Sequence, residues 1–443
     1  MKKAFVALVI GFVAVGMLVP GSASAQVAPP GAMFRSDPAH TGTYLSPPIP
    51  VIKAQLWRFQ TKDRILSSPA VADGIVYFGS DDEQLYAVEI ATGRPLWTFK
   101  AKKAFVASPA IDNGTVYIGN KDGYLYAVDA RSGIERWRFK TDDDIYSSPT
   151  VMGGIVYFGS DDKYLYAVDS RAGVEKWRLK AKKGIRTSPA VDGGLVFVGD
   201  QGGNFYAADA FTGAERWWFK APDDFVESSP AVSQGVVYVG DHGKDLFALN
   251  AASGKQQGLF KTDKTIRTSP AIAGDLLYLG ADDGNLYAID VKAGQIRWRF
   301  HAEKDIRSSP AVAGGMVYFG CEDDHLYALD AATGTLRWKF KTGKYIQASP
   351  CVANGVVFVA SADGAVYAIS GLEPGAPPVA PAAPPAAAMP PSPVPPPAPA
   401  APAPPAPAPA QPPETVPPPP PVPPPVSTTV PPVPIAPPPS TTK

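Results

Sequence analysis

Three arginines occupy the same place in a recurring pattern. Arg186, Arg267 and Arg307 each stand three residues before a proline, and Glu227 holds that position between the first two. Guanidinium groups bind carboxylates and phosphates through paired N–H donors. If these positions rim one channel, they form a basic arc that Glu227 interrupts, and the ligand to expect is a small anion or a glycan. Solvated surface arginines are the plainer alternative.

Adjacent aspartates suggest a second kind of chemistry, because carboxylates bind calcium. Each pair follows a short apolar run, where a turn is expected and where Asp accepts hydrogen bonds from the backbone. We therefore expect turn residues and predict no metal site. The pairs are Asp81-Asp82, Asp161-Asp162, Asp282-Asp283 and Asp323-Asp324.

The element that must position these side chains is a repeat marked by Ser-Pro. Successive prolines are 40 residues apart, except for one step of 41 into Pro230. A period of this length, built from short apolar runs and glycine turns, is typical of a ring of four-stranded blades. The eight prolines are Pro69, Pro109, Pro149, Pro189, Pro230, Pro270, Pro310 and Pro350.

Each repeat predicts four short strands rich in Val, Ile, Tyr and Phe. In the third repeat they are 145–151, 155–159, 164–169 and 174–179, with Gly or Asp between them. Proline suits the innermost strand because that edge faces the channel and needs no N–H there. The sequence therefore predicts an all-β, eight-bladed β-propeller over residues 51–370.

The eighth repeat predicts how the ring closes. It runs into a proline-rich tail before a fourth strand can form. The segment Gln55–Phe59 resembles the fourth strands of other repeats, such as Glu135–Phe139. We expect this N-terminal strand to complete the last blade and so remove the open edge.

A second signature follows each third strand: Ala, then Gly six residues on, then Trp ten residues on. It reads Ala127, Gly133 and Trp137 in the second repeat. This spacing resembles the tryptophan-docking motif of the pyrroloquinoline-quinone (PQQ) repeat propellers, a family that includes quinoprotein alcohol dehydrogenases and the barrel-assembly lipoprotein BamB. The resemblance implies that each indole stacks on glycine and bonds to a neighbouring blade. The structural tryptophans are Trp57, Trp97, Trp137, Trp177, Trp217, Trp298 and Trp338.

The resemblance also sets a test for enzymatic activity. Quinoprotein dehydrogenases hold PQQ on the propeller axis with a calcium or lanthanide ion, a catalytic Asp and usually an adjacent-cysteine disulfide. Here Cys321 and Cys351 are thirty residues apart, and the repeats are nearly free of insertions. We predict no catalytic residues, no metal and no cofactor, and expect PQQ with calcium only if the chain is a dehydrogenase. Buried thiols are favoured over a disulfide.

Blade five departs from the pattern. Its motif reads Ala248, Gly254 and then Gly258 where the tryptophan belongs. The extra residue of the 41-residue step falls just before it, near Glu227. Sequence drift and a partner-docking place both account for this change.

Regions outside the repeats predict export. Residues 1–25 read as a signal peptide cleaved near Ala25, residues 26–50 as a lead, and residues 371–443 as a disordered Pro/Ala-rich tail that holds 34 of the 51 prolines. We expect a monomer in the periplasm or outside the cell, with no membrane insertion once the signal is removed.

The charge balance is 41 basic against 41 acidic residues, which disfavours a nucleic-acid partner. The sequence thus favours a non-catalytic scaffold that binds proteins of the bacterial cell envelope. A PQQ-dependent dehydrogenase and a periplasmic sensor of a small anion or glycan are the two alternatives.

Overall fold

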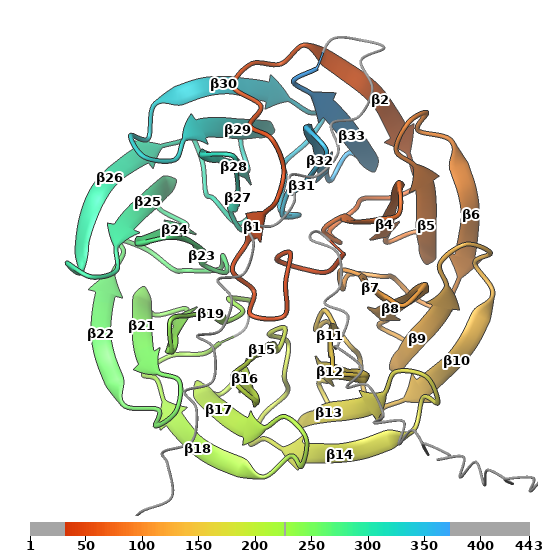
Figure 1. Ribbon diagram of the computed structural model, residues 1–443, viewed down its shortest axis with the longest axis vertical. Coiled ribbons are helices and arrows are strands. Elements are labelled where there is room, and N and C mark those ends of the chain that lie inside the picture. Colours follow the sequence, from red (N-terminus) through yellow and green to blue (C-terminus); the bar gives the residue numbers. More distant parts are fainter. Residues whose placement is uncertain (1–31, 226, 373–443) are drawn as a thin grey trace, which may run out of the picture. The chain divides into compact units, whose positions relative to one another are not determined.

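The computed structural model describes residues 32–225 and 227–372, which form eight antiparallel blades around a central axis (Figure 1). The predicted all-β, eight-bladed propeller is confirmed. The predicted signal peptide and residues 373–443 of the predicted tail lie outside the described residues. Within the described part of the chain, no helix has the length and apolar character needed to cross a membrane.

Two strands of each blade lie toward the axis. The inner strands are β3 (Ala70–Ala72), β7 (Ala110–Asp112), β11 (Thr150–Met152), β15 (Ala190–Asp192), β19 (Ala231–Ser233), β23 (Ala271–Ala273), β27 (Ala311–Ala313) and β31 (Cys351–Ala353). The second strands are β4 (Ile75–Gly79), β8 (Thr115–Gly119), β12 (Ile155–Gly159), β16 (Leu195–Gly199), β20 (Val236–Gly240), β24 (Leu276–Gly280), β28 (Met316–Gly320) and β32 (Val356–Ala360).

The other two strands lie farther out. The third strands are β5 (Gln84–Glu89), β9 (Tyr124–Asp129), β13 (Tyr164–Asp169), β17 (Asn204–Asp209), β21 (Asp245–Asn250), β25 (Asn285–Asp290), β29 (His325–Asp330) and β33 (Ala365–Ser370). The outer strands are β6 (Pro95–Lys100), β10 (Glu135–Lys140), β14 (Glu175–Lys180), β18 (Glu215–Lys220), β22 (Gln256–Lys261), β26 (Gln295–His301), β30 (Leu336–Lys341) and β2 (Ala54–Gln60).

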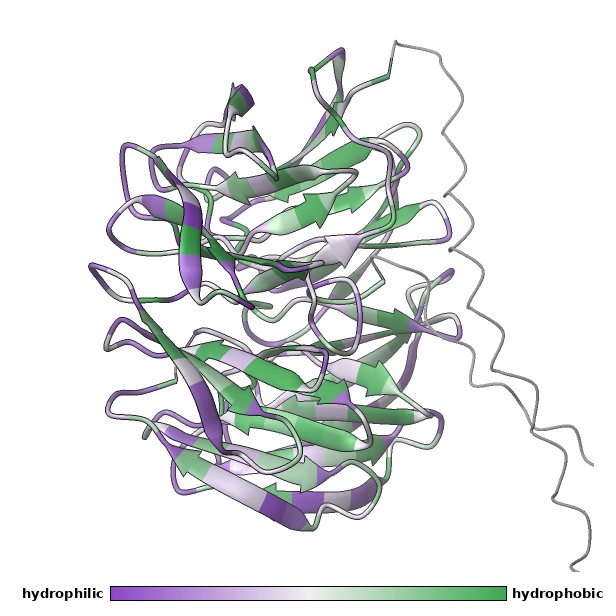
Figure 2. Cartoon of the chain, turned by 60° about the vertical axis from the view of Figure 1, so that its left-hand side comes forward, coloured by the Kyte–Doolittle hydropathy of each residue, from purple (hydrophilic) through white to green (hydrophobic). Residues whose placement is uncertain are grey.

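The core lies between the faces of neighbouring blades. The second and third strands are almost wholly buried, whereas the outer strands alternate between exposed and half-buried residues. Figure 2 shows this gradient as green strands inside and purple at loops and outer edges. The period-2 alternation appears only on strands with one solvated face, as expected for antiparallel sheets.

The inner strands are shorter than predicted. In the third blade the strand is Thr150–Met152, so the prediction of a strand over 145–151 was wrong for its first five residues. Proline has no N–H for a ladder, and the preceding serine bonds between blades instead. The backbone N–H of Ser148 donates to the Ser188 hydroxyl of the next blade at 3.0 Å.

This serine contact recurs around the axis and forms a relay from blade to blade. Each backbone N–H donates to the hydroxyl of the next blade's serine at 2.9–3.0 Å; the described pairs are Ser68–Ser108, Ser108–Ser148, Ser148–Ser188, Ser188–Ser229, Ser229–Ser269, Ser269–Ser309 and Ser349–Ser68. Between blades seven and eight, the Ser308 hydroxyl donates to the Ala348 carbonyl at 2.9 Å.

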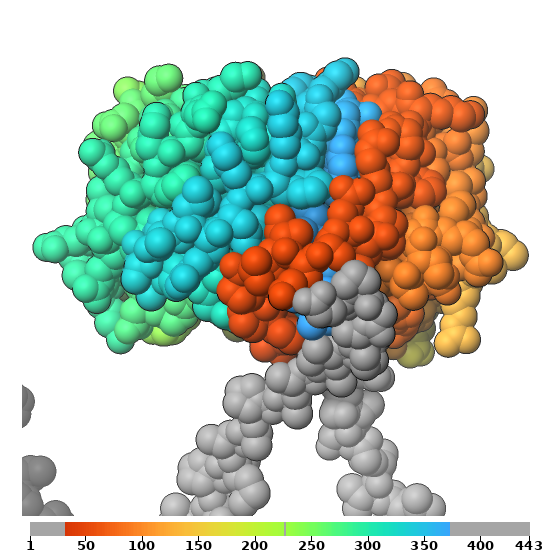
Figure 3. Space-filling view, turned by 90° about the horizontal axis from the view of Figure 1, so that it is seen from above, coloured from red at the N-terminus to blue at the C-terminus, as the bar shows by residue number. Residues whose placement is uncertain are grey.

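The ring closes as predicted. Strand β2 pairs antiparallel with β33, and Phe59 lies opposite Val366. The N-terminal segment also adds β1 (Thr43–Tyr44), which pairs in parallel with β27 of blade seven. In Figure 3 this red-orange segment lies against the blue and cyan C-terminal blades. Two separate contacts therefore join the start of the described chain to its last blades.

The seven predicted docking tryptophans form a girdle that links neighbouring blades. Each indole N–H donates to a backbone carbonyl; Trp137 bonds to Ser170 at 3.1 Å. Trp338 differs because its acceptor is Ile49 of the lead, at 2.6 Å. The other donors and acceptors are Trp57 and Ile90, Trp97 and Ala130, Trp177 and Ala210, Trp217 and Ala251, and Trp298 and Ala331.

The motif glycines are required by the indoles and by the turn. Gly173 has φ +67°, and a Cβ there would lie 2.6 Å from the Trp137 ring. Real Cβ atoms do not approach other atoms so closely, so the indole or the backbone would have to move. Gly294 has a similar φ of +64°, but no atom lies within 4 Å of its Cβ position because Gly258 replaces the tryptophan.

These two glycines allow the indole contact to be measured. We expect Gly294→Ala to lower the free energy of unfolding by about 1–2 kcal/mol, the cost of a left-handed residue with a side chain. Gly173→Ala should cost about 2 kcal/mol more because it also displaces Trp137. Urea unfolding of both variants checks this, and equal losses would contradict the stacking role.

Candidate functional site: the axial cavity

A cavity of about 330 Å³ opens on the propeller axis. It is lined by the serines of the relay and by the residues that precede each blade proline by three. The structure therefore brings Arg186, Glu227, Arg267 and Arg307 together on one rim, where the predicted arc requires them to be. The other residues of this position are Leu66, Val106, Tyr146 and Gln347.

The lead closes one end of this cavity. Phe34 lines the cavity, and residues 32–42 continue along the inner strands. Carbonyls of the lead accept hydrogen bonds from inner-strand N–H groups, which otherwise face the channel unpaired. The donor and acceptor pairs are Ile111 and Ala32, Val191 and Pro38, Val232 and Ala39, Ile272 and Thr41, and Val312 and Gly42.

Arg35 anchors residues 32–42 of the lead. Its side chain is 1% exposed, and it donates to the carbonyls of Pro310 and Pro270 at 2.5 and 2.7 Å. Burial lowers the pKa of Arg35 to about 10, so the guanidinium remains charged at neutral pH. Gly42 makes room for it, because a Cβ there would lie 2.2 Å from the guanidinium. Arg35 was not predicted as a site residue, because it lies outside the repeats.

His40 is the second buried polar anchor. Its Nε2 lies 3.0 Å from the Thr150 hydroxyl, which in turn donates to the Pro189 carbonyl at 2.6 Å. The hydroxyl has a single proton and uses it on Pro189, so His40 Nε2 is the donor in the first bond. Phe34 packs edge-on against the imidazole, with ring centroids 5.5 Å apart.

The arginines of the rim bind carboxylates of the same rim. Arg186 forms a two-atom contact with Asp161, with Nη2 2.7 Å and Nε 3.0 Å from its oxygens. This carboxylate raises the pKa of Arg186. Arg186 also lies over the Tyr146 ring, at 4.2 Å from the centroid. Its guanidinium therefore has carboxylate and aromatic partners within the protein.

Asp282 bridges the other two arginines. Its oxygens lie 2.9 Å from Arg267 Nε and 3.2 Å from Arg307 Nε. Arg267 also pairs with Glu227 at 3.0 Å, and Arg307 with Glu322 at 3.5 Å. The arc is therefore an alternating belt of ion pairs in which Glu227 is a partner of Arg267. This pairing reduces the positive charge that the rim can offer to an anion.

The pairing of these carboxylates with the rim arginines was not predicted from the sequence. All four Asp pairs lie in turns as predicted, but in three of them the first carboxylate also binds an arginine; these are Asp81, Asp161 and Asp282. Asp162 does serve its turn, accepting from the Tyr164 N–H at 3.0 Å and the Tyr166 hydroxyl at 2.8 Å. Asp161, its neighbour, binds Arg186 of the rim. The signal was available, because Asp161 and Asp282 hold the same repeat position as Glu322.

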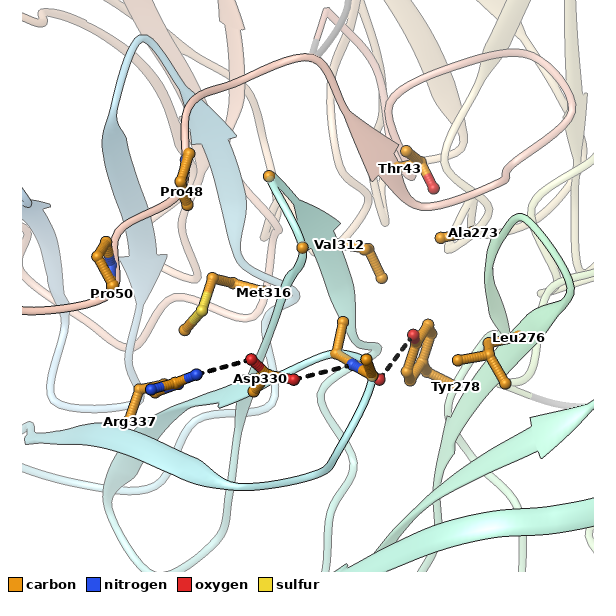
Figure 4. A pocket seen from close by; sticks show the side chains of 14 residues that line it. Thr43, Pro48, Pro50, Ala273, Leu276, Tyr278, Val312, Met316, Asp330 and Arg337 are labelled. Atoms are coloured by element: carbon orange, nitrogen blue, oxygen red, sulfur yellow. Dashed lines mark hydrogen bonds and ion pairs between the residues drawn. The ribbon is translucent and has the colours of Figure 1, made fainter.

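A second cavity, of about 720 Å³, lies where the lead crosses blades six and seven. Figure 4 shows Pro48 of the lead beside it, with Tyr278 and the Arg337–Asp330 pair below. That pair is 2.8 Å apart, and the Tyr278 hydroxyl donates to the Ala331 carbonyl at 3.0 Å. The polar groups of this groove therefore bind one another.

Comparison with known proteins identifies the repeat. A family model described as outer membrane protein assembly factor BamB matches residues 53–179, 161–301, 261–344 and 293–373. The chain belongs to this family of PQQ-like repeat propellers. No curated protein matches the chain significantly in sequence. The predicted resemblance is thus confirmed over the whole ring.

Solved structures that share this fold include BamB and two dehydrogenases. BamB from Moraxella catarrhalis is 20% identical, with a TM-score of 0.63 over 72% of this chain and 100% of that chain. A europium-containing methanol dehydrogenase is 15% identical (TM-score 0.66, 74% and 89%). Quinohemoprotein alcohol dehydrogenase from Comamonas testosteroni is 17% identical (TM-score 0.67, 79% and 81%). At these identities the likeness shows the shared fold.

The residues of this BamB-like chain do not fit a PQQ–calcium pair. Both oxygens of Asp282, which lies beside the rim, already bind arginines. Among residues 32–225 and 227–372, no three His, Cys, Asp or Glu side chains are arranged to hold a metal ion. Cys321 and Cys351 are both buried thiols that are not joined to each other, and burial raises the pKa of each to about 12.

The buried imidazole predicts a pH dependence. Burial and nearby Arg35 lower the pKa of His40 to about 3, against about 6.5 in the unfolded chain. Between these values the unfolded state binds a proton that the folded state does not. Stability should therefore fall as the pH drops below about 6.5, by at most about 1.4 kcal/mol per pH unit.

Urea unfolding at about pH 7 and about pH 5 measures this slope. In His40→Gln, which retains a donor toward Thr150, the slope should be smaller than in the wild type. His301→Gln is the control, since His301 is exposed and should leave the slope unchanged. An identical slope in wild type and His40→Gln would show that His40 is not responsible.

Proposed function

We propose that this chain is an exported, non-catalytic propeller that scaffolds protein contacts in the bacterial cell envelope. The observation that carries the proposal is that the chain's own residues close one end of the axial cavity and pair with the arginines of its rim. Phe34, Arg35 and His40 fill one end, and carboxylates of the rim pair with the rim arginines at the other. Membership of the BamB-like family supports the same role.

The outer surface offers apolar side chains for such contacts. Phe211 and Trp218, both in blade four, are 68% and 51% exposed. Exposed aromatic side chains are enriched at protein interfaces, where they contribute much of the binding energy. Blade four is therefore the first place to test for a partner surface.

Affinity capture from native envelopes tests the scaffold role. We expect the tagged mature chain to recover specific envelope proteins, and Phe211→Ser/Trp218→Ser to lower their yield by about fivefold or more, because hot-spot aromatics dominate interfaces. Ile134→Ser is the matched control, since Ile134 is also 68% exposed but lies in blade two. No enrichment over a tag-only bait would contradict the proposal.

The alternative of a PQQ-dependent dehydrogenase has a separate test, prompted by the fold shared with two dehydrogenases. The mature chain is incubated with PQQ and calcium, and dye reduction is followed with alcohols and sugars. We expect no substrate-dependent turnover, because the carboxylates beside the rim are already paired with arginines. Sustained turnover would replace the scaffold proposal.

A further inference from the structure

The docking tryptophans of the other blades show what surrounds an indole at each girdle position. The Trp298 ring stacks on Gly334 of the next blade, lies 5.8 Å from the Tyr278 ring of its own blade, and donates its N–H to the Ala331 carbonyl. The same arrangement recurs for Trp97, Trp137 and Trp177. Each position is therefore a slot with a glycine floor, an aromatic wall and a carbonyl acceptor.

The slot between blades five and six has these parts but no indole. Gly258 stands at the tryptophan position, and no atom lies within 4 Å of the Cβ position of Gly294, the floor. Ala248 is half-buried, whereas its seven counterparts are fully buried; these are Ala87, Ala127, Ala167, Ala207, Ala288, Ala328 and Ala368. Neighbouring side chains therefore do not fill the space that Gly258 leaves.

The polar groups of the vacant slot also lack their usual partners. In four other blades the hydroxyl of the second-strand tyrosine donates to the acceptor carbonyl of the next blade, as Tyr278 does to Ala331. Tyr238 is the equivalent residue here, and its hydroxyl makes no hydrogen bond with any described residue. Val291 holds the acceptor position and is half-buried, unlike fully buried Ala331. Tyr238 is 9% exposed against 2% for Tyr278, so the aromatic wall and the acceptor residue are both less covered here than in the filled slot.

We propose that this slot binds a tryptophan side chain of a partner protein, which stacks on Gly294 and donates its indole N–H to the Val291 carbonyl. The occupied slots of the same ring specify this chemistry. Residues 373–443 contain no aromatic residue, so that segment of the chain cannot supply the ring. The inference rests on the proposed function only in requiring a protein partner, because the slot itself can be tested alone.

The probe is the amide of N-acetyl-5-fluorotryptophan, titrated against the folded mature chain and followed by fluorine NMR. A single exposed slot should bind it with a dissociation constant on the order of 1 mM. Gly258→Trp places an indole in the slot from within the chain and should weaken probe binding by about tenfold or more, a loss readily measured. It should also raise the melting temperature, because it completes the girdle.

Two further variants distinguish the slot from nonspecific binding. Gly294→Ala puts a methyl group on the stacking floor and should weaken probe binding even if Gly258→Trp folds poorly. Trp298→Gly opens an equivalent slot over Gly334 and should add a second binding equivalent. Failure of the wild type to bind saturably, or unchanged binding in both Gly258→Trp and Gly294→Ala, would overturn the proposal.

Sedimentation tests whether the occupant is a second copy of the chain. Trp218 is exposed and could enter the slot of another molecule. We expect wild type and Trp218→Ala to sediment alike as monomers. Dimerisation that is lost in both Trp218→Ala and Gly258→Trp would assign the slot to self-association and overturn the partner proposal. Envelope capture with Gly258→Trp completes the test: a partner that is retained in full does not use the slot.

Discussion

The contact on which this propeller depends is the hydrogen bond from a serine backbone N–H to the serine hydroxyl of the next blade, which joins seven of the eight blade pairs. Proline follows each serine and donates no N–H, so the inner end of a blade has few backbone bonds of its own. The relay takes their place and holds adjacent blades at one spacing near the axis. The rim residues stand two positions before these serines, so the relay also sets how far Arg186 and Arg267 lie from the carboxylates they bind.

The features that repeat could be predicted from the sequence, and those outside the repeat could not. The blade number and closure by β2 follow from a period that imposes one environment on each repeat position, and the tryptophan contacts were implied by the resemblance to PQQ-repeat propellers. Arg35 and His40 were missed because the lead occurs once and has no pattern to compare. The pairing of Asp161 with Arg186 was missed for a different reason. Its neighbour Asp162 bonds within the turn, and the sequence alone does not show which of two adjacent carboxylates binds an arginine.

The rim of the axial cavity and the vacant slot differ in how their polar groups are paired. On the axis, charged groups are numerous but bound to one another, so that an incoming ligand must compete with ion pairs that are partly shielded from water. In the vacant slot between blades five and six, the polar groups are few and weakly polar, but they lack the partners that the filled slots provide. A binding surface is therefore better sought where the symmetry of the ring fails than where charges accumulate.

Closure by β2 also constrains the order in which the chain can fold. Ala54 lies opposite Ser370, so the first strand of the ring is synthesised long before its partner. Until then β2 has no sheet to join, and β33 is an open edge when it forms. Contacts of such long sequence separation form slowly, because the intervening chain must first be brought together. The lead, which bonds to inner strands of five blades, can take its place only after those blades exist. Both ends are thus fastened last, and a chain interrupted before blade eight keeps two unpaired edges.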